Sequence, residues 1–104
     1  MKKNTPNKTP KYKYLIHYHL NQLPHRMYKI TSQELPKKLG VSTETFRKWK
    51  YIQIESKATI PADKLAIIAF FFELRIEEIF NYSIPKFNFS ELEDAYLANK
   101  LQNL

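Results

Sequence analysis

The side chains best suited to chemistry lie close together in one stretch, residues 42–51. Hydroxyl, carboxylate, guanidinium and ammonium groups alternate there with Phe46 and Trp49. Such groups form hydrogen bonds and charge pairs, and the arginine fork is well suited to paired acceptors. The chemistry of this stretch is therefore non-covalent polar recognition.

Catalysis and metal binding find little support. The chain has no Cys, which excludes disulfides, thiolate metal sites and Cys nucleophiles. His17 and His19 are two residues apart on a predicted helix and point about 200° from each other, so they cannot chelate one metal. One Gly leaves no phosphate-cradling loop. We therefore predict no enzyme activity, no metal, no cofactor and no small-molecule substrate.

Charge is polarised along the chain, whose net charge is +7. Residues 1–29 contain seven Lys or Arg and no acid, whereas residues 60–104 contain four Lys or Arg and seven acids. A basic front favours a polyanionic partner. Residues 1–11 have nothing to bury and are predicted to form a disordered basic arm. No stretch resembles a signal peptide or membrane span, so we expect a cytoplasmic protein without a membrane partner.

Apolar spacing predicts an all-α fold. The first helix is expected over residues 12–23, followed by a linker over residues 25–30. A capping-box pattern at Thr31 predicts the start of a second helix that ends near residue 39. Pro36 is awkward in that helix because it removes a hydrogen bond, which predicts a shifted start or a kink.

A tight turn is predicted at Gly40, the only glycine, because glycine permits the left-handed conformation that stops a helix. Ser42 is a suitable N-cap for a third helix through about Tyr51. Phe46 and Trp49 form its inward face. The central unit reads Leu35-x3-Leu39-Gly40-Val41-Ser42-x3-Phe46-x2-Trp49. A DNA major groove admits one helix of this width.

Three further helices are expected. The fourth has Pro61 in its first turn and is apolar nearly all round. The fifth is short and covers residues 76–80. A linker containing Pro85 leads to a last helix that opens with a capping box at Ser90. Residues 81–104 are thus a linker and a helix with an unused apolar face, a possible dimerisation element.

The central unit and its surroundings resemble the lambda repressor/Cro-like (XRE-type) helix-turn-helix family. Ile60-Pro61-x3-Leu65-x2-Ile68-Ala69 looks like the fourth helix of that family, and Phe72-x-Leu74-x-Ile76-Glu77-Glu78-Ile79-Phe80 looks like its closing helix. The resemblance covers residues 13–80. It implies a five-helix helix-turn-helix domain over residues 12–80, with an additional C-terminal helix, that binds double-stranded DNA sequence-specifically.

By this resemblance, base and phosphate contacts fall on Ser42, Thr43, Glu44, Arg47, Lys48 and Tyr51, and Gln33 and Lys50 complete the predicted DNA-binding set. Arg47 is expected to make a bidentate contact with guanine, and Glu44 to accept from a cytosine amino group. Gln33, near the predicted start of the second helix, would hold a phosphate through its side chain and the helix N-terminus. The lysines that would neutralise phosphates are Lys37, Lys38, Lys48 and Lys50.

Three functions follow. The simplest is a small transcriptional regulator, which as a homodimer would read two half-sites about one helical turn apart. The second is an adaptor that binds protein, such as an antitoxin or an assembly factor. The third is an accessory DNA-binding protein of a transposase or excisionase system, because several such modules also end the recognition helix in Trp, as Trp49 does here.

Overall fold

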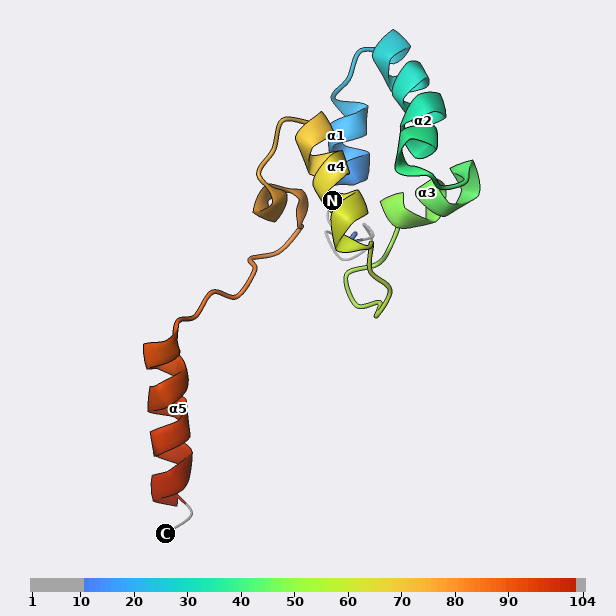
Figure 1. Ribbon diagram of the computed structural model, residues 1–104. Coiled ribbons are helices and arrows are strands. Elements are labelled where there is room, and N and C mark those ends of the chain that lie inside the picture. Colours follow the sequence, from blue (N-terminus) through green and yellow to red (C-terminus); the bar gives the residue numbers. More distant parts are fainter. Residues whose placement is uncertain (1–10, 103–104) are drawn as a thin grey trace, which may run out of the picture.

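A computed structural model describes residues 11–102, and they are mostly helical (Figure 1). The elements in order are α1 (Ile16–Asn21), α2 (His25–Leu39), α3 (Thr43–Lys50), α4 (Ala62–Phe71), the 3-10 helix η2 (Ile76–Ile79) and α5 (Phe89–Gln102). Extended pairing within the described range is limited to two isolated bridges. The all-α class is therefore confirmed, and the predicted arm lies outside the described residues except for Lys11.

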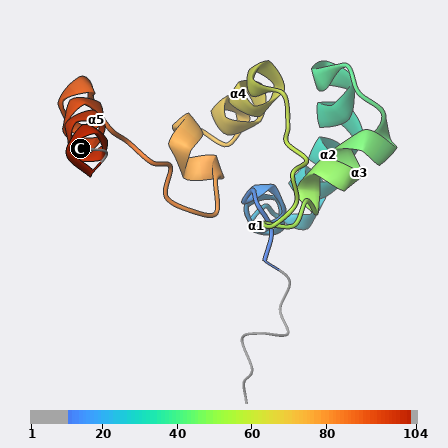
Figure 2. The same cartoon turned by 90° about the horizontal axis from the view of Figure 1, so that it is seen from below.

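One hydrophobic core holds α1, α2, α3, α4 and η2 together. Ile16 and Leu20, one turn apart on α1, are completely buried, as are Leu39, Ile68 and Ile79. Figure 2 shows α2 and α3 on one side of α4 and η2 on the other. Because every buried apolar side chain of the described chain falls between Tyr14 and Ile79, α5 takes no part in this core.

The start of the chain differs from the prediction of a helix beginning at Tyr12. Residues 11–15 are not helical, and Tyr12 and Tyr14 form isolated bridges with Gln53 and Phe80. The Tyr14 hydroxyl accepts a hydrogen bond of 3.2 Å from the backbone N–H of Ile60. These partners are distant in sequence, so helical spacing alone could not reveal them.

The predicted linker at residues 25–30 is also wrong, because α2 runs unbroken for 15 residues from His25. Thr31 does not cap a helix but is buried in the middle of one. Pro36 lies inside α2 and deletes one backbone hydrogen bond. Its ring is fully buried, and that burial offsets part of the loss.

The turn between α2 and α3 is as predicted. Gly40 has φ 72°, a left-handed conformation. Its N–H donates to Lys37 O at 3.1 Å, and the N–H of Val41 donates to Pro36 O at 3.0 Å, the paired bonds of a Schellman turn. Ser42 Oγ then accepts from the N–H of Thr45 at 3.0 Å and caps α3.

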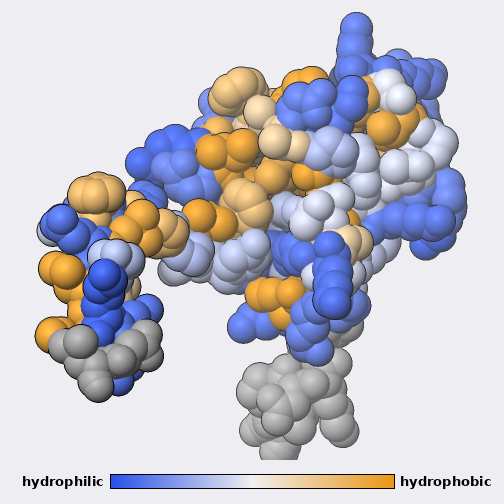
Figure 3. Space-filling model, turned by 60° about the horizontal axis from the view of Figure 1, so that its bottom comes forward, coloured by the Kyte–Doolittle hydropathy of each residue, from blue (hydrophilic) through white to orange (hydrophobic). Residues whose placement is uncertain are grey.

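The C-terminal elements follow the prediction in outline. α4 begins directly after Pro61, but the expected fifth helix is only the 3-10 turn η2. α5 begins at Phe89, because Asn88 is its cap: Asn88 Oδ1 accepts from Glu91 N–H at 3.0 Å, and Glu91 Oε1 accepts from Asn88 N–H at 3.3 Å. The predicted cap at Ser90 is thus wrong by two residues. α5 stands apart, with apolar side chains on its surface (Figure 1, Figure 3).

Candidate nucleic-acid interface

α3 is anchored on one side and open to solvent on the other. Phe46 is 2% exposed and sits in the core, while Trp49 is half-buried against it. The side chains of the opposite face are all exposed, namely Ser42, Thr43, Glu44, Arg47 and Lys48. The spacing of Phe46 and Trp49 therefore determines which polar groups reach solvent.

Two of these exposed residues are joined by a bidentate ion pair. Arg47 Nε donates to Glu44 Oε1 at 3.2 Å, and Arg47 Nη2 donates to Glu44 Oε2 at 2.5 Å. The hydrogen bond from Arg47 lowers the pKa of Glu44, and the same bond raises the pKa of Arg47. Both groups are therefore charged at neutral pH and face each other.

Ser42 is already engaged within α3. Its Oγ accepts from the N–H of Thr45 and also donates to Thr45 Oγ1 at 3.0 Å. A base contact by Ser42 would compete with this cap, whereas Thr43 and Lys48 are exposed.

Lys50 and Tyr51 do not join the exposed face. Lys50 lies one turn after Phe46 and is buried, with Nζ 5.7 Å from the centre of the Phe46 ring and 5.4 Å from that of Tyr51. Burial, followed by the nearby Arg47 charge, lowers the pKa of Lys50. Tyr51 packs against Tyr12 and His17, with ring centres 5.4 and 5.2 Å away. The spacing of four residues between Phe46 and Lys50 was the available signal.

Gln33 is exposed but lies in the middle of α2. The argument that it stands near a helix N-terminus therefore fails, because α2 begins at His25. Lys37 and Lys38 are exposed near the end of α2, and Lys37 Nζ pairs with Glu34 Oε2 at 3.1 Å.

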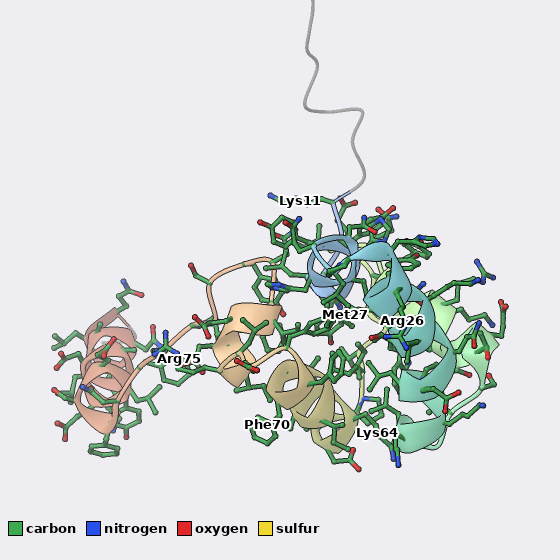
Figure 4. All side chains as sticks on the ribbon, turned by 90° about the horizontal axis from the view of Figure 1, so that it is seen from above. Lys11, Arg26, Met27, Lys64, Phe70 and Arg75 are labelled. Carbon is green, nitrogen blue, oxygen red and sulfur yellow. The ribbon has the colours of Figure 1, made fainter. Side chains whose placement is uncertain are left out.

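Two lysines reach other parts of the fold in ways that sequence reasoning missed. Lys13 is buried, and its Nζ donates to the backbone carbonyls of Ser56 at 2.5 Å and Ala58 at 2.8 Å, which ties down the loop after α3. Lys64 reaches from α4 to the end of α2 (Figure 4), where Nζ would lie 4.0 Å from a Cβ atom added at Gly40. A cation there complements the negative end of the α2 dipole. No local pattern signals either contact.

An apolar surface lies elsewhere, on α4. Ile67 and Phe71 are partly exposed, and Phe70 is 71% exposed and projects outward from the helix (Figure 4). The basic side chains of Lys11 and Arg26 lie on other elements, at the start of the described chain and on α2.

Between residues 11 and 102, no three His, Asp or Glu side chains come together as a metal site would require. None of the helices in that range combines the length and apolar character needed to cross a membrane. No protein-family model, curated protein or solved structure matches the chain.

Proposed function

We propose that this protein binds double-stranded DNA sequence-specifically, with α3 in the major groove, and acts as a small transcriptional regulator. The observation that carries the proposal is the exposed row on α3, held by a buried Phe46 and preceded by a tight turn at Gly40. A helix so anchored presents its first residues to base edges, as in helix-turn-helix proteins. The resemblance to the lambda repressor/Cro-like family supports the same function.

The charge of the chain supports a DNA partner. A net charge of +7 attracts the phosphate backbone, and Lys48 adds a cation to the exposed row of α3. In the proposed complex Arg47 reads guanine, Thr43 lies near the bases, and Lys48 contacts phosphate. Lys50 has no part in this contact because it is buried.

A fluorescence anisotropy titration of labelled random duplex DNA, repeated over a salt series, tests the proposal. We expect an association constant whose logarithm falls steeply with the logarithm of the salt concentration. Lys48→Ala should reduce that slope by about 0.9, the value for one phosphate contact. Lys100→Ala, on α5, is the matched control and should leave the slope unchanged. If the folded protein shows no binding at about 50 mM salt, the proposed function is wrong.

Sequence specificity needs a second measurement. Selection from a random duplex pool yields the preferred site, and Arg47→Ala should weaken binding to it by about 1–3 kcal/mol. If Arg47→Ala weakens the preferred site and random DNA equally, Arg47 contacts phosphate and not a base.

The exposed apolar surfaces support a homodimer as a further part of the proposal. α5 has 14 residues and none of them is buried. An isolated helix of that length is marginal in water, so contact with a partner is needed to stabilise it. A second copy supplies both α5 and the exposed Phe70 of α4.

Light scattering at tens of micromolar, with and without DNA, measures the assembly. We expect a dimer for the full chain and a monomer after truncation at Tyr82. A monomeric full chain would remove the dimer from the proposal. If the monomeric chain also lacks DNA affinity, the exposed apolar surfaces instead indicate binding to a different protein, which is the adaptor function.

A further inference from the structure

The ion pair on α3 leaves one edge of Arg47 unused. A guanidinium group has five N–H donors. In Arg47 the Nε donor and one Nη2 donor are directed to the two carboxylate oxygens of Glu44. The remaining Nη2 donor and those of Nη1 form the end edge of the group. Two parallel donors on that edge match the O6 and N7 acceptors of a guanine in the major groove.

We propose that Glu44 is a positioning residue, which holds the side edge of Arg47 so that the end edge meets one guanine, and that Glu44 does not read a base itself. This inference rests on the proposed DNA-binding function. It is an alternative to the expectation that Glu44 accepts from cytosine, because both of its oxygens accept from Arg47 and the carboxylate is therefore directed to the guanidinium group.

The pair has a second effect, on binding without sequence preference. An unpaired arginine is attracted to any phosphate, but the carboxylate of Glu44 offsets the charge of Arg47 and repels the backbone. Glu44 therefore restrains Arg47 from contacting phosphates while leaving the guanine edge available. Both side chains are 57% exposed, so both are accessible to a DNA duplex.

The chain contains a matched control for this pair. Glu34 and Lys37 on α2 form another ion pair three residues apart, at 3.1 Å, and the Glu34 side chain is 55% exposed. Glu34→Ala removes the same charge from a similar setting, but the pair does not include a proposed base-reading residue. Any effect of overall charge should therefore be the same for Glu34→Ala and Glu44→Ala.

The experiment compares the wild type, Glu44→Ala, Glu44→Gln and Glu34→Ala on the selected site and on random duplex DNA. We expect Glu44→Ala to lower the ratio of specific to random affinity at least about fivefold. Its salt slope on random DNA should steepen by about 0.9, as Arg47 gains a phosphate. Glu44→Gln keeps one acceptor oxygen, so its ratio of specific to random affinity should lie between those of the wild type and Glu44→Ala. Thermal melting confirms that each variant is folded.

Two results on DNA overturn the inference. If Glu44→Ala and Glu34→Ala change both affinities equally, only overall charge matters. If Glu44→Ala removes a preference for cytosine and leaves the guanine preference intact, Glu44 reads a base directly. In an Arg47→Lys background, which lacks the fork, Glu44→Ala should have no further effect on the specificity ratio.

A measurement without DNA separates this inference from the proposed function. NMR of the free protein should show slower solvent exchange of the Arg47 Nε–H in the wild type than in Glu44→Ala. Equal exchange rates overturn the inference even if DNA binds. Slow exchange in a protein that binds no duplex shows that the pair exists, while the DNA-binding proposal and the role of Glu44 within it both fail.

Discussion

α2 and α5 have nearly the same length, 15 and 14 residues, yet opposite surroundings. α2 buries Leu35 and Leu39, which lie one turn apart. It also buries Thr31, one turn before Leu35, and Pro36. α5 has as many large apolar side chains, but charged residues fall among them on the helix, so they form no continuous stripe, and all are exposed. The comparison shows that burial of a helix depends on a continuous apolar stripe and a partner surface, and not on its length or its number of apolar side chains.

The largest difference in unfolding free energy is expected between an alanine substitution in the core and one on α5. Phe46→Ala should destabilise the fold by about 3–5 kcal/mol, because its side chain is 2% exposed and its removal leaves a cavity. Leu97→Ala on α5 should cost less than about 0.5 kcal/mol at low protein concentration, since Leu97 is half exposed. Urea denaturation gives both values. Equal losses would mean that α5 is covered by the rest of the chain in solution.

The turn that ends α2 is the next most sensitive point. Gly40→Ala should cost about 1–2 kcal/mol, because φ is 72° and an added Cβ is strained there. A steric clash does not contribute, because the atom nearest to that Cβ is Lys64 Nζ at 4.0 Å. Denaturation of Gly40→Ala beside Gln33→Gly, at an exposed position in the middle of α2, separates the turn from ordinary helix propensity. An unchanged midpoint for Gly40→Ala would show that the turn is not left-handed.

A smaller effect is expected from pH through His19, which packs against Phe72 with ring centres 5.5 Å apart. Burial lowers the pKa of His19 below 6.5, and the charge of Glu78 opposes that shift. The unfolded chain therefore takes up this proton first, so the stabilisation is complete above pH 6.5 and is lost as pH falls through the folded-state pKa. Urea denaturation at a series of pH values measures this effect, and His19→Gln should flatten the dependence of the unfolding free energy on pH below about 6.5.

The smallest effect is expected for removal of α5. Truncation after Tyr82 should change the free energy of unfolding of the remaining chain by less than about 0.5 kcal/mol when the protein is dilute, because no α5 residue is buried. At higher concentration the full chain should gain stability that the truncated chain lacks, if dimers form. A large loss in dilute solution would contradict the separation of the two regions.

The sequence by itself determined the features that depend on residues close together in the chain. The turn at Gly40, the cap at Ser42 and the limits of α3 involve hydrogen bonds over five residues or fewer, so their pattern is visible locally. The exposed row of α3 followed from helical periodicity around Phe46. The same periodicity places Lys50 with Phe46 on the buried side.

Only the tertiary structure decided how the first described residues and the Lys13 side chain are used. The N–H of Lys13 donates to Ile52 O at 2.8 Å, and that of Leu15 donates to Ile79 O at 2.7 Å. These long-range bonds hold the segment out of the helix that its spacing predicted. Lys13 contributes to the positive charge of residues 1–29, but its Nζ donates hydrogen bonds to a loop more than forty residues away. Contacts over such separations depend on how the elements pack in space, and local periodicity contains no record of them.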